Sequence, residues 1–486
     1  MQGIRELTDQ TFDVAVIGGG IIGAGIARDA ALRGLSVALV EKADFGSGTT
    51  SGSTRLIHGG LRYLEMYDFG LVRMDLRERE ILLRIAPHLV KPLEFLIPFY
   101  GASLWFRLKM RVGMALYDLL SYDKSLPNHR MLSAAQTLAE EPTLRPEGLQ
   151  GAAAYFDAQV SMPERLCLEN ILDAERYGAV VASYTEVVDA RREGDRIVAL
   201  QIQSIESQET GELKAKVFIN ATGAWFDRVS NRTHGPAKPR LRTTKGIHIT
   251  CEPMNHKASV LFSPIDGRLF FVIPLLGQCW IGTTDTDFDA DPSTVRADGD
   301  DVEYLLRSVE PFFPNVRKLA IFSSNAGVRA LVRQEGSASS VSRMHKIEET
   351  QSGLISVLGG KITGYRAIAE EAVDDACAKL GIRTPGRTDK ELLPGALGDQ
   401  TRNLEANVER AVAQEHCWHV ADFLLRRQPS AFADDQGRSQ APYVADIMGR
   451  LLGWNPAERQ AELDRFAAEA DRALLFRQEL QPSARR

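Results

Sequence analysis

Residues 12–41 read FDVAVIGGGIIGAGIARDAALRGLSVALVE, and the pattern of these residues indicates how the N-terminal part of the chain folds. Its first six residues predict a buried strand, because they are mostly apolar and rich in β-branched side chains. Residues 21–33 have the apolar spacing of a helix, with Gly34 placed to cap its C-terminus. Residues 36–40 predict a second strand. The stretch therefore predicts a β-α-β unit.

Three glycines with G-x-G-x-x-G spacing join the first strand to the helix. Gly18 permits a tight turn, Gly20 lets the backbone approach a pyrophosphate, and Gly23 lets the helix pack closely on the strand. The helix N-terminus offers free N–H groups to phosphates. Glu41 ends the second strand, where a carboxylate can bind ribose hydroxyls. We predict a Rossmann-like dinucleotide-binding domain; a glycine-rich turn in another α/β domain is the alternative.

Length and composition set the broad class. The chain has 486 residues, 44% hydrophobic and 25% charged, which suits a globular protein of roughly three domain-sized units. A net charge of -6 argues against bulk electrostatic binding to nucleic acid. The five cysteines form no C-x-x-C pair, so we expect neither a metal site nor a disulfide framework, in a reducing compartment. No stretch has the pattern of a signal peptide or a membrane span.

A second loop narrows the choice of dinucleotide. Residues 46–55 read GSGTTSGSTR, a run of small and hydroxyl-bearing residues. Such a loop can wrap a pyrophosphate and bring backbone close to a flat ring, which favours FAD over a mobile nicotinamide. Ser51 and Ser53 are its candidate contacts. Taken alone, a run of Ser, Gly and Thr is more often an ordinary loop.

Two later blocks carry a family resemblance. Residues 56–65 read LIHGGLRYLE and residues 359–366 read GGKITGYR. Together with residues 13–41, they resemble the flavin-dependent glycerol-3-phosphate dehydrogenases, which belong to the D-amino-acid-oxidase-like group of FAD enzymes. The similarity extends over about residues 12–390. Further matching blocks are NATGAW at 220–225, KGIHI at 245–249, IGTTD at 281–285 and AGVR at 326–329.

The expected fold is α/β: a Rossmann-like FAD-binding domain, an antiparallel-sheet substrate domain and a C-terminal helical domain. Residues 240–285 are rich in strand patterns, which predicts the second sheet. Helical patterns at 402–425, 442–452 and 456–476 predict the C-terminal domain, for packing or oligomerisation, and a homodimer is one assembly this allows. The expected boundaries are 1–75, 150–235 and 345–385 for the FAD-binding domain, 76–149 and 236–344 for the substrate or cap domain, and 386–486 for the helical domain.

The resemblance implies an activity and a substrate site. The implied reaction is oxidation of sn-glycerol 3-phosphate to dihydroxyacetone phosphate by hydride transfer to flavin N5, with quinone as electron acceptor. A phosphate-bearing substrate needs fixed cations. The resemblance assigns these to Arg62, Arg329 and Lys361, with Tyr63 adding a hydrogen bond and Arg329 also counted among the catalytic residues.

The base that takes the hydroxyl proton is expected to be a histidine, because histidine titrates near neutral pH. The candidates are His58 and His248; we slightly prefer His248, and the roles could be exchanged. The resemblance further implies FAD contacts from His58, Val187, Thr222, Gly223, Gly360, Lys361 and Thr363. Departures from the family pattern at Thr243, Thr244, Ala330 and Gly364 leave room for a shifted substrate preference.

Residues 104–117 read LWFRLKMRVGMALY, bulky apolar residues mixed with basic ones. This composition is typical of a helix lying in a membrane interface, although a core helix with a basic rim is the alternative. In the family that the chain resembles, quinone-reducing members use a segment here to sit on the membrane. The expected membrane-facing segment is 104–120, and the expected location is cytoplasmic, at the inner face of the cytoplasmic membrane.

Two other functions fit the same sequence. The first is an amine or amino-acid oxidase on this fold, whose carboxylate substrate needs only one arginine and a tyrosine. The extra cations Arg62 and Lys361 argue for phosphate instead. The second is a non-catalytic, membrane-associated module that binds flavin. The retained histidines and cations argue weakly against it.

Overall fold

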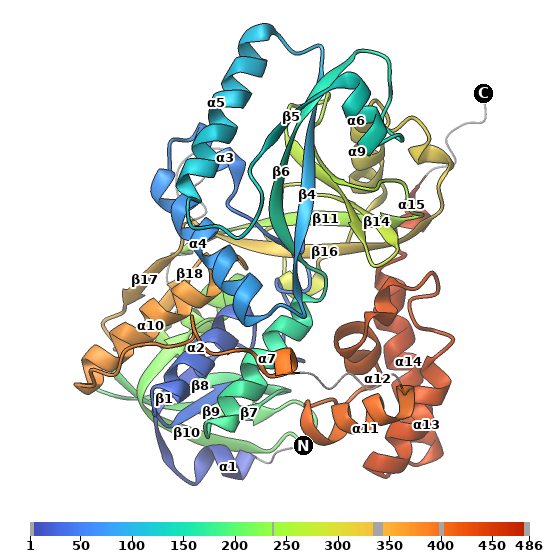
Figure 1. The fold of residues 1–486 in the computed structure, drawn as a ribbon. Helices are drawn as coiled ribbons and strands as arrows, with labels where there is room; N and C mark the ends of the chain where they lie inside the picture. The colour runs from blue at the N-terminus through green and yellow to red at the C-terminus, as the bar shows by residue number, and fades with distance from the viewer. Residues whose placement is uncertain (1–3, 236–237, 334–343, 398–402, 481–486) are drawn as a thin grey trace.

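The computed structural model describes residues 4–235, 238–333, 344–397 and 403–480. Figure 1 shows a sheet with helices in the lower part of the molecule, a second sheet above it, and a helical C-terminal region beside the first sheet. The predicted α/β class is confirmed, with both sheets and the C-terminal helices present.

The first sheet is the Rossmann-like one. Five neighbouring strands run parallel in the order β18-β10-β1-β2-β7, and antiparallel strands extend it. Helix α2 (Ile21–Leu32) follows β1 directly and packs between α7 (Pro163–Arg176) and α10 (Tyr365–Leu380). The strands are β1 (Thr11–Ile17), β2 (Val37–Val40), β7 (Val180–Ala182), β8 (Thr185–Glu193), β9 (Arg196–Ser204), β10 (Thr210–Asn220), β17 (Lys346–Glu349) and β18 (Ile355–Leu358).

The second sheet is antiparallel apart from the pair β12–β4. Residues 150–160, which the sequence assigned to the FAD-binding domain, lie in β6 of this sheet. They pair with β4 along most of its length, so the expected boundary at 150 differs from the sheet pairing. The strands are β3 (Leu56–Ile57), β4 (Val90–Tyr100), β5 (Arg130–Ser133), β6 (Leu149–Val160), β11 (Leu241–Cys251), β12 (Ala258–Phe262), β13 (Leu269–Leu275), β14 (Gln278–Gly282), β15 (Thr286–Asp287) and β16 (Ile321–Val332).

The remaining helices before the C-terminal region surround these sheets. Helix α5 projects from one end of the molecule in Figure 1, and only Met114 and Tyr117 of its residues are fully buried. The helices are α1 (Ile4–Thr8), α3 (Leu61–Glu65), α4 (Phe69–Ile85), α5 (Leu104–Leu120), α6 (Ala134–Glu140), α8 (Phe226–His234) and α9 (Gly299–Val309).

The C-terminal region has its own core, formed by α11 (Leu404–Gln414), α12 (Val420–Asp422), α13 (Ala441–Leu452), α14 (Pro456–Arg472) and nearby segments. The single helix predicted over 402–425 is wrong for the described residues. Helix α11 ends at Gln414, and His416 has a φ of +50°, which no helix continues through. The last helix, α15 (Phe476–Glu479), packs instead on the core of the second sheet.

Candidate active site

A cavity of about 1110 Å³ lies where the carboxyl ends of β1, β2 and β10 face the second sheet. Most residues singled out in the sequence converge on its lining, from widely separated parts of the chain. They are Gly18, Gly20, Glu41, Ser51, Ser53, His58, Tyr63, Val187, Thr222, Gly223, Arg329, Gly360, Lys361 and Thr363. Gly23 and His248 are not among the lining residues, and the side chain of Arg62 lies outside the described part of the structure.

The glycine turn leaves no room for side chains. Gly18 has a φ of +105°, and a Cβ there would lie 2.8 Å from the carbonyl oxygen of Ala221. A Cβ on Gly23 would lie 1.9 Å from the carbonyl oxygen of Gly18. These contacts are the close strand–helix approach that the spacing predicts, and they put the N-terminus of α2 at the cavity.

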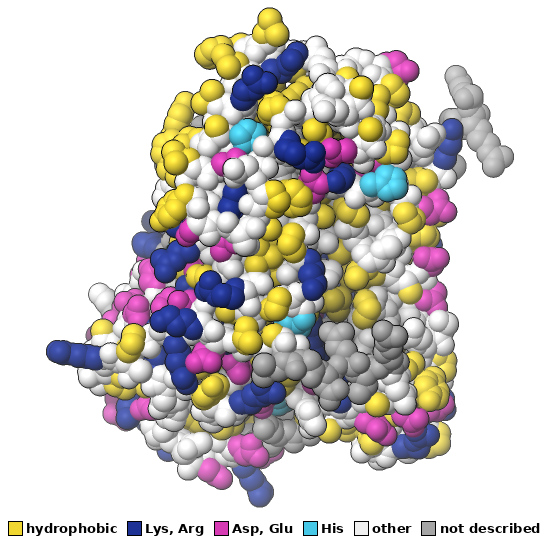
Figure 2. Space-filling model, in the orientation of Figure 1, with side chains coloured by type: hydrophobic (Ala, Val, Ile, Leu, Met, Phe, Trp, Pro, Cys, Tyr) yellow, Lys and Arg dark blue, Asp and Glu magenta, His cyan; other side chains and the backbone are white. Residues whose placement is uncertain are grey.

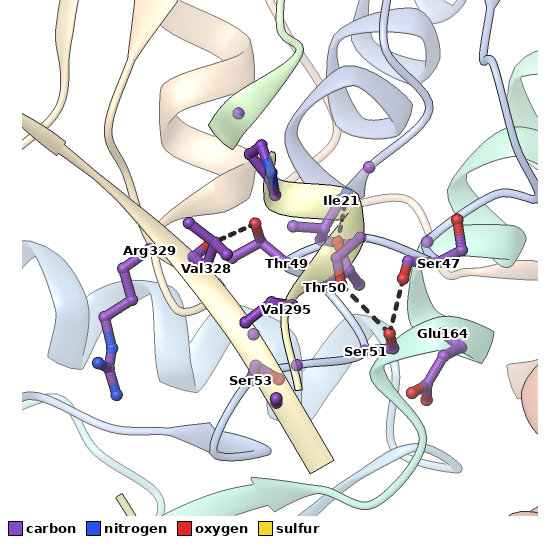
Figure 3. A pocket seen from close by; sticks show the side chains of 18 of the residues that line it. Ile21, Ser47, Thr49, Thr50, Ser51, Ser53, Glu164, Val295, Val328 and Arg329 are labelled. Carbon is purple, nitrogen blue, oxygen red and sulfur yellow. Dashed lines mark hydrogen bonds between the residues drawn. The ribbon is translucent and has the colours of Figure 1, made fainter. Parts of the chain in front are cut away.

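Three hydrogen bonds organise the turn. The N–H of Ile21, at the start of α2, donates to Thr50 Oγ1 at 3.0 Å, as Figure 3 shows. The N–H of Gly19 donates to the carboxylate of Glu41 at 2.7 Å, and the N–H of Ala43 donates to the other oxygen at 2.9 Å. Burial raises the pKa of Glu41, against the effect of these donors. Its predicted contact with a ribose stays a prediction.

The hydroxyl-rich loop lies against the strand that carries Arg329. Thr49 Oγ1 donates to the carbonyl oxygen of Val328 at 2.7 Å (Figure 3). Ser51 Oγ donates to the carbonyl oxygen of Ser47 at 3.0 Å, so its hydroxyl is turned toward its own loop. The loop thus connects the glycine turn with the second sheet across the cavity.

Arg329 is held rigidly at the cavity wall. Its Nη1 donates to the carbonyl oxygen of Thr284 at 3.0 Å and to Asp285 Oδ1 at 3.1 Å, and its Nη2 donates to Thr283 Oγ1 at 2.7 Å. A Cβ on Gly246 of the neighbouring strand would lie 2.2 Å from the guanidinium, so this side chain needs a glycine beneath it. The guanidinium is therefore pre-oriented before any ligand arrives.

Lys361 reaches the cavity from the turn after β18. Its ammonium lies 4.4 Å from the ring centroid of Tyr63 and forms an ion pair with the buried carboxylate of Asp75 in α4. The same turn is tied to the block around His58, because the N–H of His58 donates to Thr363 Oγ1 at 3.2 Å. The two blocks that carried the family resemblance thus meet at the cavity.

The two histidines differ in their surroundings. His58 lines the cavity, with Phe271 edge-on at 6.1 Å between ring centroids. His248 is buried, stacks on Trp280 at 4.8 Å and bonds through Nε2 to Thr54 Oγ1 at 3.1 Å. Burial lowers the pKa of His248 well below its usual value, and the nearby cations Arg329 and Arg55 lower it further. His248 is therefore neutral at physiological pH and lies behind the cavity wall.

Residues 13–375 match the protein family described as FAD dependent oxidoreductase. The chain belongs to the FAD-dependent oxidoreductase family. Residues 384–459 of this FAD-dependent oxidoreductase match the family described as C-terminal domain of alpha-glycerophosphate oxidase. The first match spans nearly all of both sheets, and the second covers α11, α12 and α13 and ends at the start of α14.

Relatives of known name point to one branch of the family. A glycerol-3-phosphate dehydrogenase of Synechocystis sp. is 42% identical over 82% of this chain and 75% of its own length. An aerobic glycerol-3-phosphate dehydrogenase of Staphylococcus saprophyticus is 36% identical over 89% of this chain and 79% of its own.

Solved structures agree with this placement. A glycerol-3-phosphate dehydrogenase from Bacillus halodurans, complexed with FAD, is 28% identical with a TM-score of 0.78, covering 97% of both chains. A glycine oxidase from Geobacillus kaustophilus is 22% identical with a TM-score of 0.59, covering 81% of this chain and 99% of that one. The second likeness shows a shared fold only.

The residues present fit FAD. The glycine turn provides a cradle that side chains would fill, the N-terminus of α2 faces the cavity, and Glu41 directly follows β2. The turn at Gly359 and Gly360 has φ values of +73° and +96° and also brings bare backbone to the cavity, next to the start of α2, because a Cβ on Gly360 would lie 2.9 Å from Ile22 Cδ1. Two glycine turns of this FAD-dependent oxidoreductase therefore offer backbone to a dinucleotide in the cavity.

Sequence reasoning missed several residues of the site. Thr50 lies in the quoted loop, but nothing in the loop's composition tells which hydroxyl reaches the helix N-terminus. Arg55 is buried and held by Glu164 at 2.6 Å, and both line the cavity. Asp75 bonds Lys361 across 286 residues of sequence. Such long-range pairs leave no signal in a single sequence.

Proposed function

We propose that this protein oxidises sn-glycerol 3-phosphate to dihydroxyacetone phosphate with FAD as cofactor. The observation that carries the proposal is that Arg329 and Lys361, two cations suited to a phosphate, line the same cavity as the glycine turn. The relatives at 42% and 36% identity bear the name of this activity. An amino-acid substrate presents a carboxylate, which one arginine and a tyrosine can bind, so the second cation at the cavity, Lys361, favours a phosphate.

The chain's residues supply positioning and proton transfer. Arg329, fixed by Thr283 and Thr284, engages the phosphate with the forked geometry of a guanidinium, and Lys361 adds a compact charge. When bound, FAD supplies the acceptor for the hydride that leaves the substrate carbon. His58 takes the hydroxyl proton, because it lines the cavity; His248, which the sequence slightly favoured, lies behind the wall and orients Thr54 instead.

The test is reduction of the flavin without oxygen. Purified holoenzyme is mixed anaerobically with glycerol 3-phosphate, glycerol or a panel of amino acids, and the oxidised flavin absorbance is followed. Rapid bleaching by glycerol 3-phosphate and not by glycerol supports the proposal, because glycerol lacks the anion. Bleaching by amino acids alone would assign an oxidase instead, and no bleaching by any of them would indicate a flavin-binding module without this activity.

We also propose that quinone takes the electrons at a membrane surface. Within the described residues, no helix is both long and apolar enough to cross a bilayer. Helix α5 nevertheless exposes Leu104, Trp105, Leu108, Val112 and Leu119. Arg107, Lys109 and Arg111 of the same helix are exposed too, and Figure 2 shows hydrophobic and basic side chains together at this end of the molecule. This combination suits peripheral attachment to an anionic lipid surface.

A further inference from the structure

Asp75 is a buried carboxylate that the proposed reaction does not use. It lies on α4 with no solvent exposure, and one of its oxygens, Oδ2, pairs with the ammonium of Lys361. Its other oxygen, Oδ1, has no hydrogen-bond partner among the described residues. The backbone of Gly364 lies close to this oxygen, since a Cβ there would lie 3.7 Å from Oδ1, at ordinary van der Waals distance. A carboxylate satisfied on one side only is poised to accept a proton.

Lys361 stands between this carboxylate and the cavity. Its side chain is 18% exposed, and its ammonium lies 4.4 Å from the ring centroid of Tyr63, which also lines the cavity. When Asp75 is ionised, the pair is neutral as a whole and attracts an anion weakly. When Asp75 is protonated, the charge of Lys361 is free to act on an anion in the cavity.

The surroundings of Asp75 allow both forms near neutral pH. Burial, together with the nearby carboxylates of Asp157 and Glu78, raises the pKa of Asp75 to about 7 against the opposing effect of Lys361. Those two carboxylates have cations of their own. Arg79 forms an ion pair with Asp157 at 2.6 Å, and Arg366 forms one with Glu78 at 2.6 Å. Lys361 is therefore the cation that pairs with Asp75.

We propose that Asp75 is a positioning residue whose protonation releases Lys361 for anion binding, so that a phosphate-like anion enters the cavity together with one proton. The proton goes from water to a carboxylate oxygen of Asp75, and the anion takes over the ammonium of Lys361. The inference rests on the proposed function for the identity of the natural anion. The coupling between protonation of Asp75 and anion binding depends only on the Asp75–Lys361 ion pair and on the charge of the anion.

The test uses sulfate, a dianion that does not titrate in this range and is not oxidised. Its affinity for the oxidised holoenzyme is read from changes in the flavin absorbance between pH 6 and 8.5. For complete linkage, sulfate binding weakens by up to about tenfold per pH unit above pH 7. Asp75→Asn should bind sulfate with less pH dependence, and more tightly than the wild type at pH 8.5.

Two further variants keep the test decisive. Lys361→Gln should bind sulfate more weakly and lose the same component of the pH dependence, whether or not Asp75→Asn folds. Asp123→Asn, which alters an exposed ion pair with Arg73, should behave as the wild type. An unchanged pH dependence in the Asp75 or Lys361 variant, or no sulfate binding by the wild type, overturns the proposal. Flavin reduction by glycerol 3-phosphate is measured separately, so a failure of the proposed function is distinguishable.

Discussion

Arg329 shows how one side chain is prepared for a ligand. Three hydrogen bonds to residues 283–285 fix its guanidinium, and Gly246 gives it space. An arginine held in this way loses little conformational entropy when it binds a phosphate. We therefore expect the loss of Arg329 to lower the affinity for the substrate directly.

Replacing Arg329 by alanine should raise the KM for glycerol 3-phosphate while the protein keeps its flavin. Loss of a charged hydrogen bond costs about 2 kcal/mol, which corresponds to an increase on the order of 30-fold. Steady-state kinetics and the ratio of flavin to protein absorbance measure the two effects. Arg242→Ala, which removes an arginine of the neighbouring strand paired with Asp287, is the control and should leave KM unchanged. An unaltered KM for Arg329→Ala would make the phosphate assignment wrong.

Gly23→Ala should weaken FAD binding, because the new methyl group would lie 1.9 Å from the carbonyl oxygen of Gly18 and push the turn apart. We expect an affinity at least about tenfold lower, from the strain of an overpacked contact. Reconstitution of apoprotein with FAD, followed by flavin fluorescence, measures it. Gly70→Ala adds the same methyl group where no atom lies within 4 Å and should bind FAD normally. Equal affinities for the two variants would refute this role of Gly23.

Among the helices and strands, the sequence predicts those features that depend on residues close together in the chain. The residues of the β-α-β unit, with its glycines and Glu41, form β1, α2 and β2 nearly as expected, because periodicity and glycine spacing act within a few turns. The strand patterns of residues 246–284 likewise match β11 to β14. Three features depend on residues far away in the chain, which a single sequence does not reveal. They are the helix break at His416, the pairing of β6 with β4 and the burial of His248.

Helix α5 has two apolar faces, which is why its apolar and basic residues do not separate onto two clean sides in the sequence. Phe106, Met110, Met114 and Tyr117 face the core, while Trp105, Leu108, Val112 and Leu119 form a second apolar stripe that stays exposed. The double substitution Trp105→Ser and Val112→Ser should weaken binding to anionic lipid vesicles by about tenfold or more, since each buried apolar side chain contributes on the order of 1.5–3 kcal/mol. Vesicle sedimentation measures this. Leu451→Ser, on an exposed site of α13, is the control. Binding that survives the double substitution would place the membrane contact elsewhere.

At the scale of the whole molecule, the C-terminal region is tied to the cofactor side by buried charges. Asp44, three residues beyond Glu41, bonds Arg427 at 2.7 Å and Arg426 at 2.5 Å. Burial alone would raise the pKa of Asp44, but Arg427 and Arg426 outweigh it and hold the pKa at about 2. Phe432 of the same region lines the cavity, and the centroid of its ring lies 4.7 Å from Cζ of Arg55.

Asp44→Asn should loosen this docking, because it leaves two buried arginines short of their shared anion, a loss of about 3 kcal/mol or more. Denaturant unfolding and limited proteolysis measure it, with Asp471→Asn, at an exposed pair with Arg438, as the control. Because the folded pKa lies below the unfolded one, the contribution of Asp44 is present above about pH 4 and is lost as the pH falls toward 2. A variant as stable as the wild type at pH 7 would show that the pair does not hold the two parts together.

A single anaerobic turnover tests directly whether this protein oxidises glycerol 3-phosphate with its flavin. One equivalent of glycerol 3-phosphate is added to oxidised holoenzyme without any acceptor, and both the flavin spectrum and the product are measured. We predict one equivalent of two-electron-reduced flavin and one of dihydroxyacetone phosphate, both formed much more slowly by the Arg329→Ala variant at the same substrate concentration. A flavin that stays oxidised in the wild type, or one reduced without formation of that product, would contradict the account.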